Sequence, residues 1–491
     1  MKRVVLTILA LVAALAGTLV TRTLRVPPPA LPAAALTAVA MDSSTSAQRL
    51  SGAVKFATVS FASGARIDTA AFLGFQGFLA TSFPRVHATL TLERIAGLSL
   101  LYTWTGMDST AAPIVLMGHM DVVPVPDANL KEWTHGPFSG DVADGYVWGR
   151  GTLDDKVTVL AVLEAVEQML ARGARPARTV YLTFGHDEEV GGRFGARALV
   201  DTLVRRGVKP AMVIDEGGVM AKGTVPGVPG LAAVVGIAEK GYLSLRLRAR
   251  AVGGHSSMPS GRTAVGALSR AIAALEKNPF PNSLEGPTRG MLDAMAPYVP
   301  FTTRMAFANL WLTSPLIIRT LAKTPSTAAM MHTTTSPTML SAGIKDNVLP
   351  PEASAVVNFR IRPGETMESV ISRVHTVIAD TMIAVEPTDS ARTDPSPVSD
   401  PNSAAFKLIA STVRGMVPGV SVPVLPYLVV GGTDAKYWGP HSSNVYRFLA
   451  VPLDETDLSR IHGVNERVSV AGYTSAVTFF VQLLSRLDQL K

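Results

Sequence analysis

The chain has 491 residues, too many for one ordinary hydrophobic core, and its 47% hydrophobic and 17% charged content is typical of a folded globular protein. It contains no cysteine, which excludes disulfides, thiol nucleophiles and thiolate metal ligands, so any metal site must use His, Asp and Glu. The net charge of +7 is spread along the sequence without the Lys/Arg cluster that binds nucleic acid, and no nucleic-acid partner is expected.

The N-terminal segment 1–25 has the pattern of an export signal. Lys2 and Arg3 precede an uncharged, mostly apolar run, Val4–Val20, which is longer than a usual signal-peptide core and at the short limit of a membrane span. A small-residue cleavage motif within the run leaves two outcomes open, a cleaved signal peptide or a retained membrane anchor. The protein is therefore expected to be exported, either membrane-anchored or periplasmic or secreted. Segment 26–45, rich in Pro and Ala, is expected to be a tether without regular structure.

From residue 46 onward, strand patterns alternate with helix patterns. The expected strands are 113–117, 179–184 and 211–215, and the expected helices are one capped by Asp68, then 155–172 and 193–206. This alternation predicts an α/β fold, a mostly parallel sheet covered by helices on both faces. Residues 46–240 are expected to form the first part of this larger domain.

The pattern changes at Gly241. An alternating strand follows it directly, then a helix at 262–277 and another alternating strand at 354–362, which is typical of an antiparallel sheet. We expect 241–363 to be a smaller α+β domain inserted into the first. The larger domain then resumes over 364–491 and ends in an apolar-faced helix, 468–490.

A long stretch, 278–339, lies inside the inserted domain and is rich in large apolar residues. These residues are Met291, Met295, Phe301, Met305, Phe307, Leu310, Trp311, Leu316, Ile317 and Ile318. They are too many for a freely solvated loop. Three uses remain open: an extension of a core, a dimer face, or an apolar wall for an acyl chain or a membrane surface.

Clusters of His, Asp and Glu follow several of the expected strands. They are His119 with Asp121, Asp154 with Asp155, Glu188 with Glu189, Asp215 with Glu216, and His462 near the C-terminus. Each has an ordinary alternative, since an acidic triplet can be a solvated turn and an Asp pair can cap a helix. Ligands of open α/β sheets, however, bind at the carboxyl ends of the strands, where three of these clusters fall. Together they suffice for two metal ions sharing a bridging carboxylate, with one carboxylate left for proton transfer.

His119 and Asp121 are two residues apart directly after an expected strand. Residues i and i+2 of an extended segment point the same way. His119 can therefore face a metal while Asp121 accepts its other ring N–H and fixes the tautomer.

Eight ordered segments resemble one known family. They are "GHMDVVP", "GRGTLDDK", "HDEEVGG", "DEGG", "GGHSSMP", "NFRIRPG", "GGTDAK" and "HGVNE". The chain is similar, from about Ser46 to its C-terminus, to the co-catalytic zinc exopeptidases that include aminoacylase-1, acetylornithine deacetylase and carboxypeptidase S. The insertion resembles the carboxypeptidase S branch, which includes N-fatty-acyl-amino-acid synthase/hydrolases.

The resemblance implies two Zn²⁺ ions per subunit, with Co²⁺ or Mn²⁺ as substitutes. By motif, His119, Asp154 and Asp215 would hold one ion, and Asp154, Glu189 and His462 the other. Asp121 would orient His119, and Glu188 would act as general base, taking a proton from the water that bridges the ions so that a bridging hydroxide attacks the substrate. His255 would stabilise the oxyanion, in relatives often across a dimer interface of the inserted domain, so a homodimer is implied. Arg360, Asn347, Gly432 and Thr433 would bind the free carboxylate of the substrate.

The activity implied is hydrolysis of the amide bond next to a C-terminal or N-acylated amino acid with a free carboxylate. The substrate would be a small molecule or a short peptide. Two alternatives are open. A membrane-tethered binding protein without turnover would have lost the base or a ligand, and neither is lost. An aminopeptidase or dipeptidase of the same family would need an acidic anchor for an α-amine in place of Arg360.

Overall fold

A computed structural model describes residues 1–36, 41–61, 67–259, 261–388 and 392–490. The expected tether therefore falls partly outside the described residues, at 37–40. The remaining expected elements lie within them.

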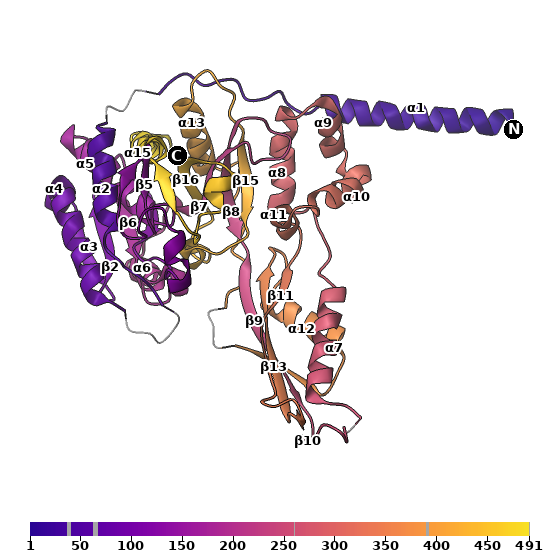
Figure 1. Ribbon diagram of the computed structural model, residues 1–491. Coiled ribbons are helices and arrows are strands. Elements are labelled where there is room, and N and C mark those ends of the chain that lie inside the picture. The colour runs from indigo at the N-terminus through magenta and orange to yellow at the C-terminus, as the bar shows by residue number, and fades with distance from the viewer. Residues whose placement is uncertain (37–40, 62–66, 260, 389–391, 491) are drawn as a thin grey trace.

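An eight-stranded sheet forms the centre of the larger body (Figure 1). In sheet order its strands are β1 (Thr91–Ile95), β2 (Ser99–Trp104), β6 (Val180–Gly185), β3 (Ile114–His119), β7 (Met212–Lys222), β16 (Val445–Leu453), β8 (Leu231–Glu239) and β15 (Val424–Val429). The pairs β6–β3, β3–β7, β7–β16 and β8–β15 are parallel, whereas β1–β2, β2–β6 and β16–β8 are antiparallel. The sheet is thus mixed, with a parallel centre that places several strand ends at one edge.

Helices cover both faces of this sheet, as the α/β pattern predicts. One layer contains α2 (Ser43–Val54), α5 (Lys156–Ala171), α13 (Ala404–Met416) and α15 (Val470–Leu484), and the other contains α6 (Ala196–Arg205) and the 3₁₀ helix η4 (Asp434–Trp438). Strand β3 shows why: Ile114 and Leu116 pack in the first core and Val115 and Met117 in the second, because successive side chains alternate between faces.

A local signal sets the start of α3 (Thr69–Ser82). Asp68 accepts hydrogen bonds from Ala70 N and Ala71 N at 3.1 and 3.2 Å and begins this helix, as predicted. The last helix differs from the expectation. It ends at Leu484, and a separate 3₁₀ turn covers Leu487–Gln489, so its apolar positions beyond 484 are buried by a turn rather than by a continued helix.

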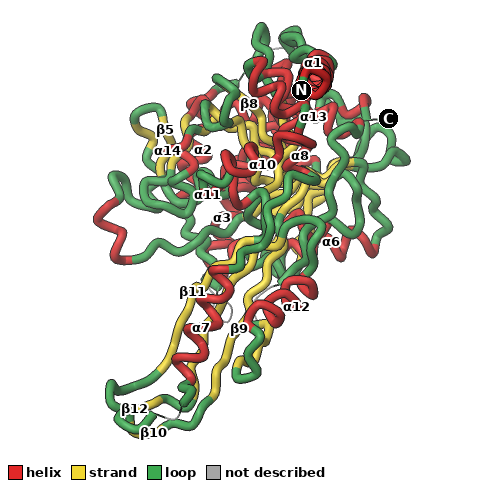
Figure 2. Tube along the Cα trace, turned by 90° about the vertical axis from the view of Figure 1, so that its right-hand side faces the viewer, coloured by secondary structure: helices red, strands yellow, loops and turns green. Residues whose placement is uncertain are grey.

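A second sheet builds an arm that extends from the body (Figures 1 and 2). Its strand order is β11 (Thr334–Ala342), β13 (Glu352–Ile361), β9 (Gly241–Arg250) and β14 (Ile383–Pro387), all antiparallel. The apolar positions of β9 alternate into a separate core beneath α7 (Ala264–Lys277) and α12 (Met367–Ile378). The short strands β10 (Gly254–His255) and β12 (Val348–Leu349) form the far tip.

The apolar stretch 278–339 is mostly helical. It contains α8 (Pro287–Met295), α9 (Phe301–Ala308), α10 (Leu310–Leu321) and α11 (Pro325–Ala329), and its last residues enter β11 of the arm. Several of its apolar side chains form a third core against β7, β8 and β15. Core extension thus accounts for Leu292, Phe307 and Ile317, but Trp311 and Leu316 remain exposed.

The N-terminal helix α1 (Lys2–Leu24) projects from the body, and its 18-residue apolar window has a mean hydropathy of 2.5 and no buried share. By length and composition it could cross a membrane. The following residues, 26–36, adopt no helix or strand but contact the body. Leu36 N donates to Gly415 O at 3.1 Å, and Ala30 N donates to the Tyr298 hydroxyl at 3.2 Å. Leu36 also fills the space that a side chain at Gly415 would need.

Candidate metal centre

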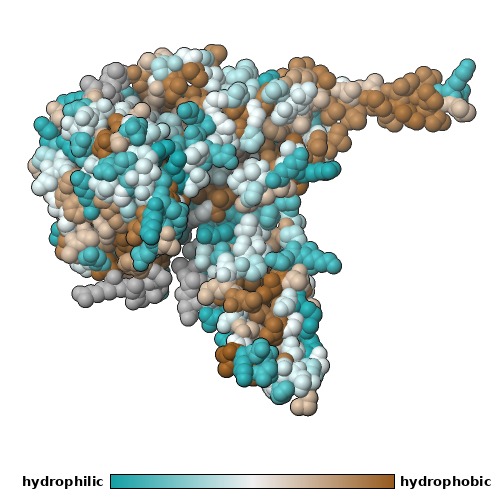
Figure 3. All heavy atoms as spheres, viewed as in Figure 1, coloured by the Kyte–Doolittle hydropathy of each residue, from teal (hydrophilic) through white to brown (hydrophobic). Residues whose placement is uncertain are grey.

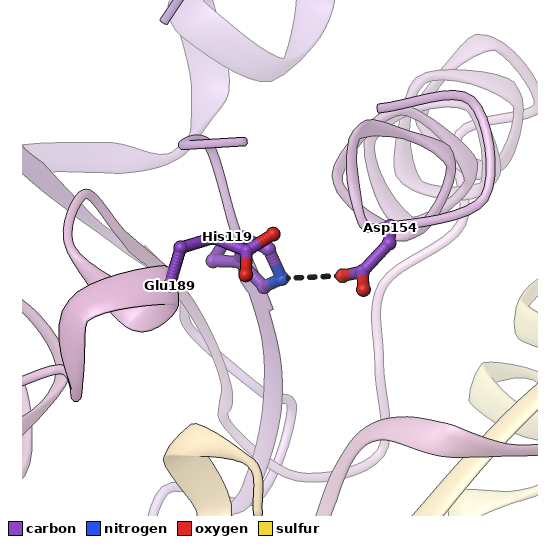
Figure 4. Close-up of side chains that lie close together, drawn as sticks. All are labelled: His119, Asp154 and Glu189. Carbon is purple, nitrogen blue, oxygen red and sulfur yellow. Dashed lines mark hydrogen bonds and ion pairs between the residues drawn. The ribbon is translucent and has the colours of Figure 1, made fainter. Parts of the chain in front are cut away.

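Three side chains from separate segments meet at the edge of the parallel strands (Figure 4). His119 ends β3, Asp154 precedes α5, and Glu189 lies just after β6. One ligand atom of each lies within 4.8 Å of the others, and His119 Nε2 is 2.9 Å from Asp154 Oδ1. Imidazole nitrogen and carboxylate oxygen are the donor set that zinc and similar divalent ions accept.

His462 joins this group from a loop near the C-terminus. Its Nε2 lies 2.9 Å from Asp154 Oδ2 and 3.3 Å from Glu189 Oε2. Asp154 thus places one oxygen against each histidine. This is the arrangement required of a carboxylate that bridges two ions.

Asp121 lies beneath these residues and is fully buried. Its backbone oxygen is 2.9 Å from His119 Nδ1, and its carboxylate is 3.4 Å from the same nitrogen. Its two carboxylate oxygens also accept hydrogen bonds from Glu188 N and Glu189 N, both at 3.1 Å. Asp121 therefore orients the imidazole, mainly through its backbone oxygen, and its carboxylate fixes the loop that carries both glutamates.

The three adjacent carboxylates of "HDEEVGG" have different surroundings. Asp187 accepts hydrogen bonds from Phe194 N and Gly195 N, both at 2.7 Å, and closes the loop. Glu189 faces His119 and Asp154, and Glu188 lies beside it in the 3₁₀ turn η2 (Glu188–Val190). The loop is crowded: a Cβ at Gly192 would lie 1.9 Å from Asp434 Oδ1, and the φ of Gly192 is +69°. Only glycine satisfies both conditions.

The second residue of the "DD" pair is directed away from the ligands. Asp155 is buried, and its Oδ2 accepts a hydrogen bond from His119 N at 3.2 Å. Its other oxygen is hydrogen bonded to the Thr158 hydroxyl. Asp155 therefore ties the start of α5 to the end of β3 and holds His119 and Asp154 next to each other.

A buried ion pair, Arg150 with Glu466, joins the two loops that carry Asp154 and His462. Arg150 Nη2 donates to His462 O at 3.1 Å, and Glu466 Oε1 accepts from Leu153 N at 2.8 Å. Strand β17 (Arg467–Ser469) pairs with β5 (Tyr146–Trp148) immediately beside this pair. Sequence reasoning did not single out either residue, although both lie within the quoted motifs "GRGTLDDK" and "HGVNE".

Asp215 and Glu216 follow each other in β7 but face different partners. The carboxylate of Asp215 accepts a hydrogen bond from Ala435 N at 2.7 Å. Glu216 lines the same cavity as Asp154. Burial raises the pKa of Glu216, and the charges of nearby acidic residues add to the shift. Both residues are therefore candidates for the fifth ligand position.

Protonation at the centre follows from burial and from the close carboxylates. Burial raises the pKa of Glu188 to about 8, against the opposing charges of His119 and Lys436. Hydrogen bonds to Asp154 and Glu189 raise the pKa of His462 to about 10. Burial works against ionisation of Asp154, yet its hydrogen bonds to both histidines hold its pKa below the usual range.

One further observation indicates that these residues suit a metal ion. Glu189 Oε1 is buried and has no hydrogen-bond partner among the described residues. A buried carboxylate oxygen without a partner is costly, so it indicates a missing cation or water. Its Oε2 partner, His462, belongs to the same cluster.

The residues expected to contact the rest of the substrate lie in three places. His255 and Asn347 lie near each other at the tip of the arm, where Ser256 N donates to Asn347 O at 3.2 Å. Arg360 lies at the opposite end of β13, close to the body, with its guanidinium 4.7 Å from the centre of the Tyr242 ring. It is eight residues from Glu352 along the strand, or roughly 26 Å at about 3.3 Å per residue. Within one chain, the tip does not reach the metal centre.

Gly432 and Thr433 lie beside the body end of the arm. Glu239 accepts hydrogen bonds from Thr433 N at 3.1 Å and from its hydroxyl at 2.8 Å. Glu239 is in turn paired with buried Arg447 at 3.1 Å. This turn is thus positioned by a buried acid, and its own Thr433 N–H is already engaged.

A cavity of about 900 Å³ opens from the metal centre. Asp154 and Glu216 lie at one end, and its wall continues along apolar residues of β7, β15 and β16 to Met291 and Met330 of the insertion. A second cavity of about 450 Å³ lies between α8, α9 and α10 and shares Met291 and Met330 with the first. The two cavities are neighbours with a shared wall, and both are lined mostly by apolar side chains on the side away from the polar centre.

Known proteins resemble this chain over most of its length. The profile of Peptidase family M20/M25/M40 matches residues 115–486. The chain is 39% identical to "Probable carboxypeptidase S-like 2" of Dictyostelium discoideum over 90% of its length and 85% of the relative. It is also 39% identical to "N-fatty-acyl-amino acid synthase/hydrolase PM20D1" of Xenopus tropicalis, again over 90% and 85%.

A solved structure has the same fold. The M20 family metallo-carboxypeptidase Sso-CP2 from Sulfolobus solfataricus superimposes with a TM-score of 0.66 at 18% sequence identity, covering 90% of this chain and 99% of that one. The chain belongs to Peptidase family M20/M25/M40. It is a hydrolase of the metallopeptidase class, with His119, Asp154 and Glu189 as its candidate metal site.

Proposed function

We propose that this hydrolase cleaves the amide bond between an acyl group and an amino acid with a free carboxylate, and that it prefers long acyl chains to acetyl. The observation that carries the proposal is the pair of adjoining, mostly apolar cavities between Asp154 and the insertion, which together would form one apolar route for an acyl chain. A peptide backbone would leave polar groups without partners along such a wall. An alkyl chain gains about 0.8 kcal/mol per buried methylene there.

Two zinc ions are proposed at the centre, with Co²⁺ or Mn²⁺ as substitutes. His119, Asp154 and Asp215 would hold one ion, and Asp154, Glu189 and His462 the other. Glu216 is the alternative to Asp215, because the Asp215 carboxylate already accepts the Ala435 N–H and Glu216 lines the cavity. When bound, such ions polarise the amide carbonyl and make water more acidic.

Glu188 is the proposed general base and acid. Its loop is fixed through the hydrogen bond between its own N–H and Asp121, and its burial raises the pKa of its carboxyl group to about 8. A carboxylate whose pKa lies near the working pH can accept a proton from the attacking water and then release it to the leaving amine. Glu188 would thus carry one proton from one side of the cleaved bond to the other.

Arg360 is the proposed anchor for the free carboxylate. Its planar guanidinium can bind both carboxylate oxygens, and its stacking on Tyr242 holds it in place. Burial lowers the pKa of Arg360, and the charge of Glu188 opposes that shift, which is consistent with a cation facing the reaction centre. Gly432 and Thr433 would complete this end of the site.

His255 and Asn347 are proposed to act on a second subunit. Their distance from the centre of their own chain is too great for contact, whereas an extended arm can reach across an arm-to-arm homodimer. The same arm would then serve as lid and dimer interface. The expected bounds of the inserted domain, 241–363, need a correction, because α12 and β14 pack in the arm whereas α8 to α10 pack on the body. The rest of 46–240 and 364–491 would be the catalytic domain.

The N-terminal helix supports export and attachment to a membrane. We propose that α1 is retained as an anchor rather than removed. Thr23 is buried against the insertion and Asn309 Nδ2 donates to Leu19 O at 3.2 Å, so the end of the helix is part of the packed structure.

A screen of purified full-length protein tests the function. Substrates are N-acyl amino acids from acetyl to long fatty chains, each as free acid and as C-terminal amide, with short peptides alongside and with and without added zinc. We expect kcat/KM to rise with acyl length and to collapse for the amides. A flat or falling profile would favour a peptide carboxypeptidase, as the name of the Dictyostelium relative suggests. Equal rates for acids and amides would instead favour an aminopeptidase or dipeptidase. No hydrolysis at all would favour a binding protein.

A further inference from the structure

The hairpin α9–α10 presents large apolar side chains to solvent. Phe301, Trp311, Leu312 and Leu316 are 47%, 57%, 45% and 62% exposed, although other apolar residues of the same helices pack into the core beneath. A cluster of exposed aromatic and aliphatic side chains is unusual on a soluble surface and typical of an interaction site. Core packing therefore explains only the inner side of this hairpin.

This hairpin contacts the one helix that is long and apolar enough to cross a membrane among the described residues. Asn309, between α9 and α10, donates from Nδ2 to Leu19 O of α1 at 3.2 Å, and Arg22 Nε donates to Ala308 O at 3.3 Å. Figure 3 shows the apolar surface of α1 continuing onto the body at its base. A bilayer that contained α1 would meet the protein at this base.

The composition of the hairpin suits the surface of a bilayer. Arg319 and Lys323 are exposed at the C-terminal end of α10, one to two turns beyond Leu316. Interfacial helices combine Trp and Leu on the buried side with Lys and Arg that contact anionic headgroups. The hairpin carries both kinds of residue next to the anchor.

The cavity between α8, α9 and α10 opens at the same surface. Leu316 is highly exposed and also lines this cavity of about 450 Å³, whose inner end shares Met291 with the cavity of the metal centre. The apolar route from Asp154 therefore ends at the hairpin rather than at the polar surface. An acyl chain held in lipid faces the entrance directly.

We propose that the α9–α10 hairpin docks on the phospholipid bilayer that holds α1, and that the acyl chain of a membrane-dissolved substrate enters the cavity beside Leu316 without passing through water. The identity of the substrate and the retention of α1 rest on the proposed function, whereas the docking of the hairpin does not depend on which substrate is cleaved. The occupant of the exposed patch is thus lipid rather than a second copy of the chain.

The absence of native cysteine allows a direct test. Leu312→Cys, Leu316→Cys and the control Leu92→Cys, in the distant edge strand β1, each carry one polarity-sensitive fluorophore on the full chain. The proteins are reconstituted into vesicles of phosphatidylethanolamine and phosphatidylglycerol with nitroxide on the lipid chains. We expect the lipid nitroxide to quench the fluorophore at 312 and 316 at least about twofold more than at 92. Iodide in the aqueous phase should quench the fluorophore at 92 more than at 312 and 316.

Equal iodide access at all three positions would overturn the docking. Protection at 312 and 316 that needs no vesicles and rises with protein concentration would overturn it in favour of a second copy. The readout does not depend on turnover. A wild type that cleaves no long-chain substrate in any form would therefore reject the proposed function, whereas lipid quenching at 312 and 316 would still support the docking.

A double variant tests whether the substrate enters from the bilayer. We expect Trp311→Glu combined with Leu312→Glu to lower kcat/KM about tenfold for a long-chain N-acyl amino acid held in vesicles, because two charges would separate the entrance from the bilayer. The rate on a water-soluble N-acetyl amino acid should not change, which shows that the variant is folded. An unchanged rate on the vesicle-held substrate would overturn entry from the bilayer.

Discussion

The metal centre and the helical insertion lie at the two ends of one cavity and are built from opposite interactions. At the centre, Asp121, Asp155 and Glu466 fix the positions of ligand-bearing loops through short, directional hydrogen bonds. In the insertion, apolar side chains such as Leu292, Phe307 and Ile317 pack without any such bonds. Directional contacts specify a geometry, whereas apolar contacts specify mainly a volume. We therefore expect almost no substitution at the metal centre to preserve the reaction. Many substitutions in the insertion should be compatible with substrate selection.

The largest effect is expected at the centre. Glu188→Gln keeps the shape of the side chain but removes its basic oxygen, so kcat should fall about 10²–10⁴-fold while the metal content stays unchanged. Metal analysis and initial rates on the same preparation measure both. Glu276→Gln, on the exposed side of α7, is the matched control and should leave the rate unchanged. Near-normal turnover by a fully metallated Glu188→Gln variant would remove Glu188 from the mechanism.

Arg150→Ala tests whether the centre depends on its buried polar frame. The change leaves Glu466 buried and unpaired and frees the loop of His462, so the free energy of unfolding should fall by about 3–5 kcal/mol. Chemical denaturation measures it. The control Arg206→Ala breaks the exposed pair with Glu93 and should cost under about 1 kcal/mol. Equal losses in the two variants would show that the buried pair stabilises the fold no more than the exposed pair does.

Met291→Trp tests the apolar end of the cavity. Met291 lines both cavities, and a larger ring there should narrow the route between them. We expect kcat/KM for long acyl chains to fall about tenfold, equivalent to two lost methylene contacts at about 0.8 kcal/mol each, while the acetyl substrate is unaffected. Met339→Trp, on the exposed face of the arm, is the control. A loss shared by acetyl and long-chain substrates would show that the route is not the acyl site.

The last prediction concerns pH and Lys240, which lies between the larger sheet and the insertion. Its Nζ donates to Ala329 O and His332 O at 2.8 Å each, and burial lowers its pKa to about 7. The unfolded chain binds this proton up to about pH 10.5, so between pH 7 and 10.5 it holds more protons than the folded chain and stability rises with pH. Denaturation at several pH values should show a flatter slope for Lys240→Met than for wild type. The exposed control Lys407→Met should keep the wild-type slope.

Sequence reasoning located the centre because its residues are chemically distinctive. His119, Asp154, Glu189 and His462 come from separate motifs, and the structure brings them together at the expected edge of the sheet. The α/β alternation and the Asp68 cap could also be predicted from the sequence, because strand and helix periodicity and capping are local properties.

Other features depended on contacts that no local pattern contains. The pair Arg150–Glu466 spans more than 300 positions of the chain, and neither residue has a spacing that signals its partner. The sequence shows that the insertion is apolar. Whether a given side chain faces a core, a cavity or solvent depends on how α8, α9 and α10 pack together. The opposite orientations of Asp215 and Glu216 likewise follow from tertiary contacts, since both lie in the same strand.

The segment that links α1 to the body has a consequence for kinetics. Residues 26–36 run along the surface and are held there by contacts of Ala30 and Leu36, so they do not form a long flexible linker. With α1 in a membrane, the entrance of the cavity stays at a fixed height and cannot sample the surrounding solution. Turnover of a lipid-dissolved substrate would then follow the number of substrate molecules per unit area of membrane rather than their bulk concentration, and diluting the vesicles would leave the rate per enzyme unchanged.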